Sequence, residues 1–273
     1  MSTYVDRSSK GKIKISRPNK GQLKFRMLII ATILFTIAGF FMMDYKGLEL
    51  WPAITGTLVN LRDMFLMPQL NQITLGSAIW QVIITLSLAF LSTILGAVIS
   101  LFLAFGAAMN LSKPWVSQTI KTFITIVRAV PTVLWVLIFA IAAGLGSVAA
   151  IIGMVFHSIA YLVKAYSEAF EEIDEGKIEA LRATGSNYFH ILFHVVIPQT
   201  KSFLIAWTFL RFEINFGVAV AMGAAAGAGG IGYALFMSSG FYYDMNEVGM
   251  ITYMILIVAI LLEVVANKLK AAA

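Results

Sequence analysis

Long apolar blocks separated by short polar segments run through most of this chain. A transmembrane helix needs roughly 20 predominantly apolar residues, whereas a soluble core is built from shorter runs. The pattern predicts an all-α polytopic membrane protein with about six transmembrane helices and a cytoplasmic loop between the fourth and fifth. The predicted spans are Met27–Met43, Ala78–Ala108, Thr119–Ala143, Val148–Tyr166, Ser202–Met222 and Val248–Asn267.

The segments between the spans differ in length and polarity. Residues 44–77 mix charged, aromatic and proline residues, which favours an extracytoplasmic loop with one interfacial helix around Ala53–Phe65. Asn110–Gln118 is predicted to be a short cytoplasmic turn, and Gly144–Ser147 a tight outer turn. The longest polar stretch inside the apolar core covers residues 167–201.

Composition indicates the same class of protein. Hydrophobic residues make up 59% of the 273 residues and charged residues 12%, whereas soluble domains carry roughly 25% charged residues. The chain has no cysteine, which excludes disulfide and thiolate chemistry.

The net charge of +6 is concentrated at one end of the chain. Residues 1–26 contain eight Lys or Arg residues and one Asp, so the charge does not indicate nucleic-acid binding. Basic residues beside a first span stay in the cytoplasm, and six spans return the C-terminus to the same side. The predicted layout is a basic cytoplasmic tail (1–26), a first helix with its outer loop (27–77) and a core (78–268) containing the loop at 167–201.

The polar loop at 167–201 carries the signals of two short helices. Lys177–Thr184 reads as the first, with Gly185 placed to end it in a left-handed cap. Ser186 or Asn187 can cap a second helix, Tyr188–Val196, which we expect to stop before Pro198. An apolar stripe on this second helix can rest against the membrane helices. It consists of Tyr188, Ile191, Leu192 and Val195.

The first loop helix is then held at the membrane surface with Glu179, Ala180, Arg182 and Ala183 facing outward. Small residues let a partner protein come close, and charged residues fix its register. The alternative is a solvated loop that merely connects two spans. Two capped helices with this glycine placement favour a docking surface.

The loop also carries a family resemblance. The run Glu179-Ala180-Leu181, three residues, Gly185, nine residues, Val195, one residue, Ile197-Pro198 resembles the signature loop of ABC-importer permeases. That loop is usually written E-A-A, three residues, G, nine residues, I, one residue, L-P, so the departures here are conservative. The resemblance implies a coupling helix that sits in a groove of a cytosolic ATPase subunit. The implied coupling residues are Glu179, Ala180, Leu181, Arg182, Gly185 and Pro198.

Further motifs across residues 78–268 together resemble the phosphonate-transporter permease. They are Arg128-Ala-Val-Pro131, Glu168-Ala-Phe-Glu-Glu-Ile-Asp-Glu-Gly176, Arg211-Phe-Glu-Ile-Asn215 and Gly227-Ala-Gly-Gly-Ile-Gly-Tyr233. Two positions depart from that family: Thr132 stands where an acid is common, and Gly217 where an arginine is common. The substrate implied is phosphonate or a related phosphorus oxyanion.

The same resemblance implies a complex in the bacterial cytoplasmic membrane. It would contain two permease copies, two ATPase subunits and a substrate-binding protein on the outer face. This chain would bind no cofactor, because ATP and Mg are used by the ATPase. The alternatives are an importer for phosphite, phosphate or an amino acid, an ion-driven secondary transporter, and a structural membrane protein.

Charged residues inside predicted spans are candidates for the transport path, because a charge at the bilayer centre costs several kcal/mol and must face protein or water. Arg128 and Arg211 each lie roughly 15 Å into a span at helical rise. One interpretation is that either arginine pairs with Glu213 and locks the bundle, and the other is that a guanidinium lines an oxyanion path. The pathway candidates are Arg128, Pro131, Arg211, Glu213, Asn215, Gly229 and Gly230.

A proline, three histidines and the glycine motifs have expected roles of their own. Pro131 is expected to kink the third span, and His157 to be a hydrogen-bonded interior histidine. His190 and His194 have the spacing of a metal pair but lack a third ligand, so no metal site is expected. The pattern G-x-G-x-x-G at residues 227–232 follows a membrane span rather than a strand, so nucleotide binding is rejected. No G-x-x-x-x-G-K-[ST] occurs, and the chain is not expected to be an enzyme.

Overall fold

The computed structural model describes residues 20–43 and 47–272, and every regular element in those ranges is helical. The elements are α1 (Lys20–Met42), α2 (Leu50–Leu66), α3 (Leu75–Ala107), α4 (Pro114–Ala129), α5 (Thr132–Ala143), α6 (Ser147–Glu171), α7 (Glu175–Ala183), α8 (Tyr188–Ile191), the π-helical segment η1 (Leu192–Val196), α9 (Ile197–Ala226), α10 (Ile231–Gly240) and α11 (Met245–Ala272).

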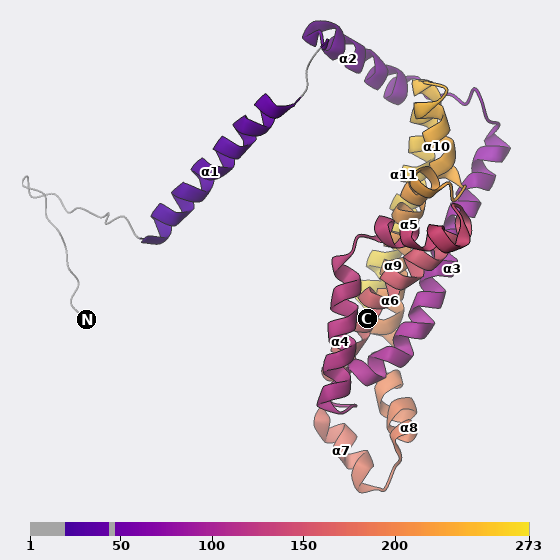
Figure 1. Cartoon of the computed structure of the whole chain (residues 1–273). Coiled ribbons are helices and arrows are strands. Elements are labelled where there is room, and N and C mark those ends of the chain that lie inside the picture. The colour runs from indigo at the N-terminus through magenta and orange to yellow at the C-terminus, as the bar shows by residue number, and fades with distance from the viewer. Residues whose placement is uncertain (1–19, 44–46, 273) are drawn as a thin grey trace, which may run out of the picture. The chain divides into compact units, whose positions relative to one another are not determined.

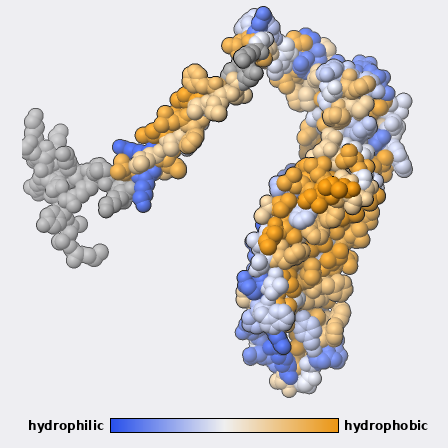
Figure 2. All heavy atoms as spheres, in the orientation of Figure 1, coloured by the Kyte–Doolittle hydropathy of each residue, from blue (hydrophilic) through white to orange (hydrophobic). Residues whose placement is uncertain are grey.

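The chain divides into two compact units, residues 1–56 and 57–273. In the first unit, α1 begins at Lys20, seven residues before the predicted span. The last seven residues of the predicted tail at 1–26 therefore belong to α1, and residues 1–19 lie outside the described ranges. The surface of α1 is apolar along most of its length and hydrophilic at its N-terminal end (Figure 2).

The second unit is a bundle in which α3, α6 and α9 pack against one another. The short helices α7 and α8 lie at one end of it and α10 near the other (Figure 1). Its surface is apolar around the middle and hydrophilic toward the α7–α8 end (Figure 2). This distribution fits a bundle whose middle lies in lipid and whose ends lie in water.

Small residues allow α3 and α6 to lie close together. A Cβ added at Gly96 would come within 2.8 Å of the Ser158 Cβ, and the Ser100 hydroxyl donates to the Ile159 carbonyl at 3.2 Å. Ala104 and Ala108 are fully buried. The small-residue spacing along the second span thus marks a helix-packing face.

The third predicted span is not one helix. The chain bends by 91° between α4 and α5, with Val130 and Pro131 in extended conformations. The prediction of a kink at Pro131 was too weak, because proline disfavours the helical conformation of the residue before it and lacks an N–H to continue the helix. The Trp135 indole N–H donates to the Val127 carbonyl at 3.0 Å, which satisfies a carbonyl left open at the end of α4.

Other boundaries also shift. The expected turn at Asn110–Gln118 is shorter, because Pro114 occupies the first turn of α4. The glycine-rich stretch does not end α9 at Met222, since the helix continues to Ala226, and α10 was not predicted. In the described ranges, five helices are long and apolar enough to cross a membrane, and the bent α4–α5 pair brings the number to six. The interfacial helix around Ala53–Phe65 corresponds to α2.

Candidate functional site

Helix α7 begins earlier than predicted. Asp174 is its N-cap, and the Asp174 carboxylate accepts a hydrogen bond from the Gly176 amide at 2.9 Å. Gly176 therefore lies in the first turn of α7. An acidic N-cap followed by Glu175 suits the positive end of a helix dipole.

The end of α7 confirms the predicted cap. Gly185 has φ +78°, its amide donates to the Arg182 carbonyl at 3.0 Å, and the Ser186 amide donates to the Leu181 carbonyl at 3.2 Å. These two bonds form a Schellman motif, which needs a residue in the left-handed region at the glycine position. The chain reverses here and leads into α8.

Asn187 caps α8 as predicted, because its side-chain oxygen accepts from the His190 amide at 2.9 Å. The helix does not stop before Pro198, however. It passes through the π-helical segment η1 directly into α9, with Pro198 in the first turn of α9. The wider π turn makes room for a proline ring that would otherwise press on the carbonyl four residues earlier.

The two loop helices rest on an apolar core. Ile178 of α7 is 2% exposed and packs with Ile191, Leu192 and Val195 against α3 and α6. Tyr188, predicted to join this stripe, is 41% exposed, so that part of the prediction was wrong. The outward-facing residues of α7 are as predicted. Glu179, Ala180, Arg182 and Ala183 are all exposed.

A hydrogen-bonded linkage ties α7 to the bundle, and the sequence did not reveal it. Arg182 donates to the Asn110 backbone carbonyl at 3.3 Å, and the Asn110 side chain donates through Nδ2 to the Phe170 carbonyl at 2.7 Å. Glu171 accepts from the Met109 amide at 2.8 Å and from Lys121 at 2.7 Å. A displacement of α7 would therefore reach both α6 and α4.

Two aromatic side chains also enlarge the exposed surface at this end. Phe189 and Phe193, four residues apart on α8 and η1, are 65% and 62% exposed. Their i, i+4 spacing was visible in the sequence, but only the packing shows that this face is unpartnered within the described chain. The neighbouring His190 and His194 have ring centroids 5.5 Å apart. No group of three His, Cys, Asp or Glu side chains is placed to hold a metal in the described ranges.

A second polar group lies inside the bundle, around Arg211 of α9. The Arg211 side chain is only 3% exposed, and its Nε donates to the Ser158 hydroxyl at 3.0 Å. Asn215, fully buried, donates through Nδ2 to Ser158 and to Thr93, each at 2.9 Å. Asn215, four residues after Arg211 on α9, therefore lies on the same helix face and shares the Ser158 hydroxyl with it. The Nη2 atom of Arg211 has no hydrogen-bond partner among the described residues.

The ring of Tyr161 brings the two membrane arginines together. The guanidinium carbon of Arg128 lies 4.7 Å from the ring centroid, and that of Arg211 lies 4.9 Å from it. His157 is also close, with its ring 5.4 Å from that of Tyr161. Its Nδ1 atom has no partner within the described chain, so the expectation of a fully hydrogen-bonded histidine was wrong.

Glu213 does not pair with either arginine. The ion pairs of the described residues are Arg62–Asp63, Lys121–Glu171 and Lys164–Glu168. Glu213 instead lines a groove between α9 and α11 that also contains Gly217 and Glu263. The interpretation of a locking salt bridge is therefore wrong, because residues two apart on a helix point in different directions.

The glycine-rich junction of α9 and α10 packs on α3. The Ile231 amide donates to the Thr85 hydroxyl at 2.9 Å. A Cβ added at Gly230 would collide with that hydroxyl, and its φ of +76° also favours glycine. Gly229 has a positive φ as well. This geometry explains both glycines by local packing, and their place in a transport path stays a prediction.

With this geometry in place, comparison with known proteins defines the class. Residues 96–272 match the family described as binding-protein-dependent transport system inner membrane component, and the chain belongs to that family. This confirms the resemblance to ABC-importer permeases.

Several relatives are named for phosphorus oxyanions. The chain is 40% identical over 152 residues to the phosphate-import permease protein PhnE of Mycolicibacterium smegmatis, covering 55% of this chain but only 28% of that protein. It is 33% identical over 187 residues to the phosphite transport system permease protein PtxC of Stutzerimonas stutzeri, covering 68% and 67%. A putative cryptic phosphonate transport system permease of Escherichia coli is 33% identical over 44% of this chain and 96% of its own length.

Solved structures share the fold. The chain superimposes on an inward-facing MetNI methionine ABC transporter chain with a TM-score of 0.64 and 21% identity, covering 74% of this chain and 100% of that one. An amino acid ABC transporter chain gives a TM-score of 0.57 and 15% identity, over 83% and 99%.

Proposed function

We propose that this chain is the transmembrane permease subunit of an ABC importer that carries phosphonate or a related phosphorus oxyanion. The family and the names of its relatives support the transport class and the phosphorus chemistry. The observation that carries the choice of an anion is Arg211, a buried guanidinium with no carboxylate partner in the described ranges and one unbonded nitrogen.

The proposed partners are a second permease copy, two cytosolic ATPase subunits and an extracytoplasmic binding protein. In this arrangement both termini and α7 lie in the cytoplasm. ATP and Mg are used by the ATPase, and this chain supplies no enzymatic activity of its own.

Coupling in this proposal begins at the exposed face of α7. A groove in the ATPase holds Glu179 and Ala180, and closure of that groove moves α7 as a rigid element because its Schellman cap and Ile178 anchor it. The Arg182–Asn110 bond and the Glu171–Lys121 pair then pass the displacement to α4 and α6. Each bond is individually weak, so the apolar core under α7 provides most of the rigidity.

The transport path in this proposal runs past Arg128 and Arg211. Two guanidinium groups without a described carboxylate favour an anion near them, and their planar donor edges match an oxyanion. The break at Pro131 places the end of α4, with Arg128, next to the start of α5. Glu213 faces another groove and does not neutralise the pair.

The test is transport by the purified complex. The full chain would be isolated from its native membrane with its associated subunits and reconstituted in vesicles. We expect uptake of a phosphorus oxyanion that requires ATP, and we expect Arg211→Gln to abolish it while the subunits still assemble. Uptake without any ATPase, or uptake of methionine but no phosphorus oxyanion, would contradict the proposal.

A further inference from the structure

We propose that the crevice beside Arg211 holds the organic substituent of a phosphonate while the arginines hold its oxyanion head. This inference rests on the proposed function and narrows the substrate to phosphonates that carry an apolar group on phosphorus. The relatives named above differ on this point, because phosphate and phosphite carry no such group.

The head site is formed by Arg211, Arg128 and Tyr161. Both guanidinium groups lie within 5 Å of the centre of one ring, and Arg211 is 3% exposed. A guanidinium over a ring face keeps N–H groups available for an oxyanion, and the Nη2 atom of Arg211 has no hydrogen-bond partner among the described residues. Two like charges in an apolar bundle are costly without a counter-charge, and a doubly charged oxyanion supplies it.

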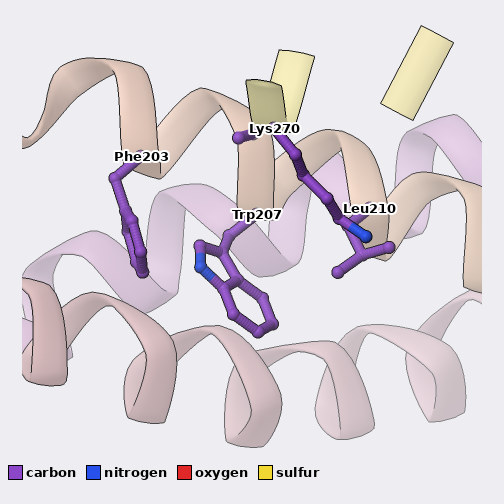
Figure 3. Close-up of a pocket in the computed structure, with 5 residues that line it drawn as sticks. Phe203, Trp207, Leu210 and Lys270 are labelled. Atoms are coloured by element: carbon purple, nitrogen blue, oxygen red, sulfur yellow. The ribbon is translucent and has the colours of Figure 1, made fainter. Parts of the chain in front are cut away.

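The crevice begins at that head site. Arg211 and Tyr161 line it together with Leu162, Ile214, Trp207 and Leu210. This part beside Arg211 is small, about 30 Å³. Trp207 and Leu210 also line a second, larger crevice of about 270 Å³ together with Phe203, Ala206 and Lys270 of α11, and we infer that a substituent passing between Trp207 and Leu210 reaches it. Figure 3 shows Phe203, Trp207 and Leu210 projecting from α9 on the same side, with the Lys270 side chain reaching Leu210.

The walls of this crevice suit an alkyl or aryl group. Apart from Lys270 at the far end, they are aromatic and aliphatic. A polar group on the substituent would therefore find few hydrogen-bond partners there. An apolar substituent attached to the phosphorus at Arg211 would enter directly between Trp207 and Leu210. Inorganic phosphate and phosphite would bind the same arginines but leave the crevice unused.

The area that the substituent buries sets the expected gain in binding affinity. Each methylene removed from water contributes about 0.8 kcal/mol, a factor of about 4 in affinity. We therefore expect affinity to rise about fourfold per added methylene until the crevice is filled. Inorganic phosphate and methylphosphonate should bind most weakly.

The experiment measures binding to the intact permease–ATPase complex in detergent, without the binding protein, whose own selectivity would mask the effect. The ligands are inorganic phosphate and the series from methyl- to butylphosphonate. Calorimetry measures the dissociation constant of each. We expect the graded increase for the natural chain and a butyl-to-methyl affinity ratio that falls toward one for Leu210→Trp, which fills the crevice. Ile94→Trp, in a separate apolar groove, is the matched control and should keep the ratio.

A flat series in the natural chain would overturn the inference, whether or not a phospholipid is found in the crevice. The same holds if Leu210→Trp and Ile94→Trp change the ratio equally. The outcome is separable from that of the proposed function, since ATP-driven uptake of phosphate with a flat series refutes only the substituent site. Loss of all phosphorus oxyanion transport refutes the proposed function itself.

Discussion

Arg211 illustrates how a single residue is accommodated inside an apolar bundle. Its Nε bonds to Ser158, which also accepts from Asn215, and its guanidinium lies over Tyr161. Ser158 and Tyr161 are three residues apart on α6, so one face of that helix supplies both contacts. The charge is thus held by neutral dipoles and a ring face, which leaves it available to an anion.

Gly185 has a left-handed backbone conformation that residues with a side chain rarely adopt. Its φ of +78° costs roughly 1–2 kcal/mol for an L-residue and more for a β-branched one. We expect Gly185→Val to break the Schellman bonds and loosen α7, reducing ATP-driven uptake severalfold while the complex still inserts in the membrane. Uptake and ATP hydrolysis measured on the same vesicles would show hydrolysis no longer matched by transport.

The control for that change is Gly76→Ala. Gly76 lies in the first turn of α3 with no atom near its added Cβ and an ordinary φ. It should transport like the natural chain. Normal coupling by Gly185→Val would mean that the α7 cap plays no part in the mechanism.

Among the elements, the segment before α3 and the helices α10 and α11 are joined by one buried carboxylate. Glu247 is fully buried and accepts from the Gln72 and Ile73 amides at 3.2 and 3.0 Å, and from the Ser238 hydroxyl at 3.1 Å. Polar groups buried without a partner cost about 1–3 kcal/mol each. This carboxylate therefore stabilises the end of the bundle opposite α7.

We expect Glu247→Leu to lower the free energy of unfolding by about 2 kcal/mol or more, since it leaves the Ile73 amide and the buried Ser238 hydroxyl without their acceptor. The melting temperature of the detergent-solubilised protein would report this loss. Glu263→Leu, an exposed position on the same helix, is the control and should change the melting temperature little. Equal stability of the two variants would contradict the assigned role of Glu247.

At the scale of the whole molecule, the two ends of the second unit are separated by the length of α3, which is about 50 Å for 33 residues. Ala180 on α7 and Phe241 after α10 are both exposed and lie toward opposite ends. Because the chain has no cysteine, single cysteines can be introduced without background labelling.

A membrane-impermeant maleimide should label Phe241→Cys in intact cells and Ala180→Cys only in inside-out vesicles. This result follows from the proposed orientation, in which the basic N-terminal end and α7 lie in the cytoplasm. The reverse labelling pattern would overturn the proposed orientation and, with it, contact between α7 and a cytosolic ATPase.

The sequence by itself determined the class of protein, most helices, the end of α7 and the start of α8. N-caps and the glycine at 185 depend on residues within a turn or two, and hydrophobic length depends on one continuous stretch of about 20 residues, so all three can be read along the sequence. Local signals were also sufficient to identify the outward face of α7. They misplaced the starts of α1 and α7, because a helix often extends into polar residues at its ends.

Only the tertiary structure decided what surrounds the buried charges. Arg128 and Arg211 are 83 positions apart, and Tyr161 meets both only because α4, α6 and α9 pack together. The same packing turned Glu213 away from both arginines and formed the crevice at Trp207. The 91° bend at Pro131 also could not be predicted from the proline alone. Proline interrupts a helix, but the neighbouring helices set the direction of the chain beyond it.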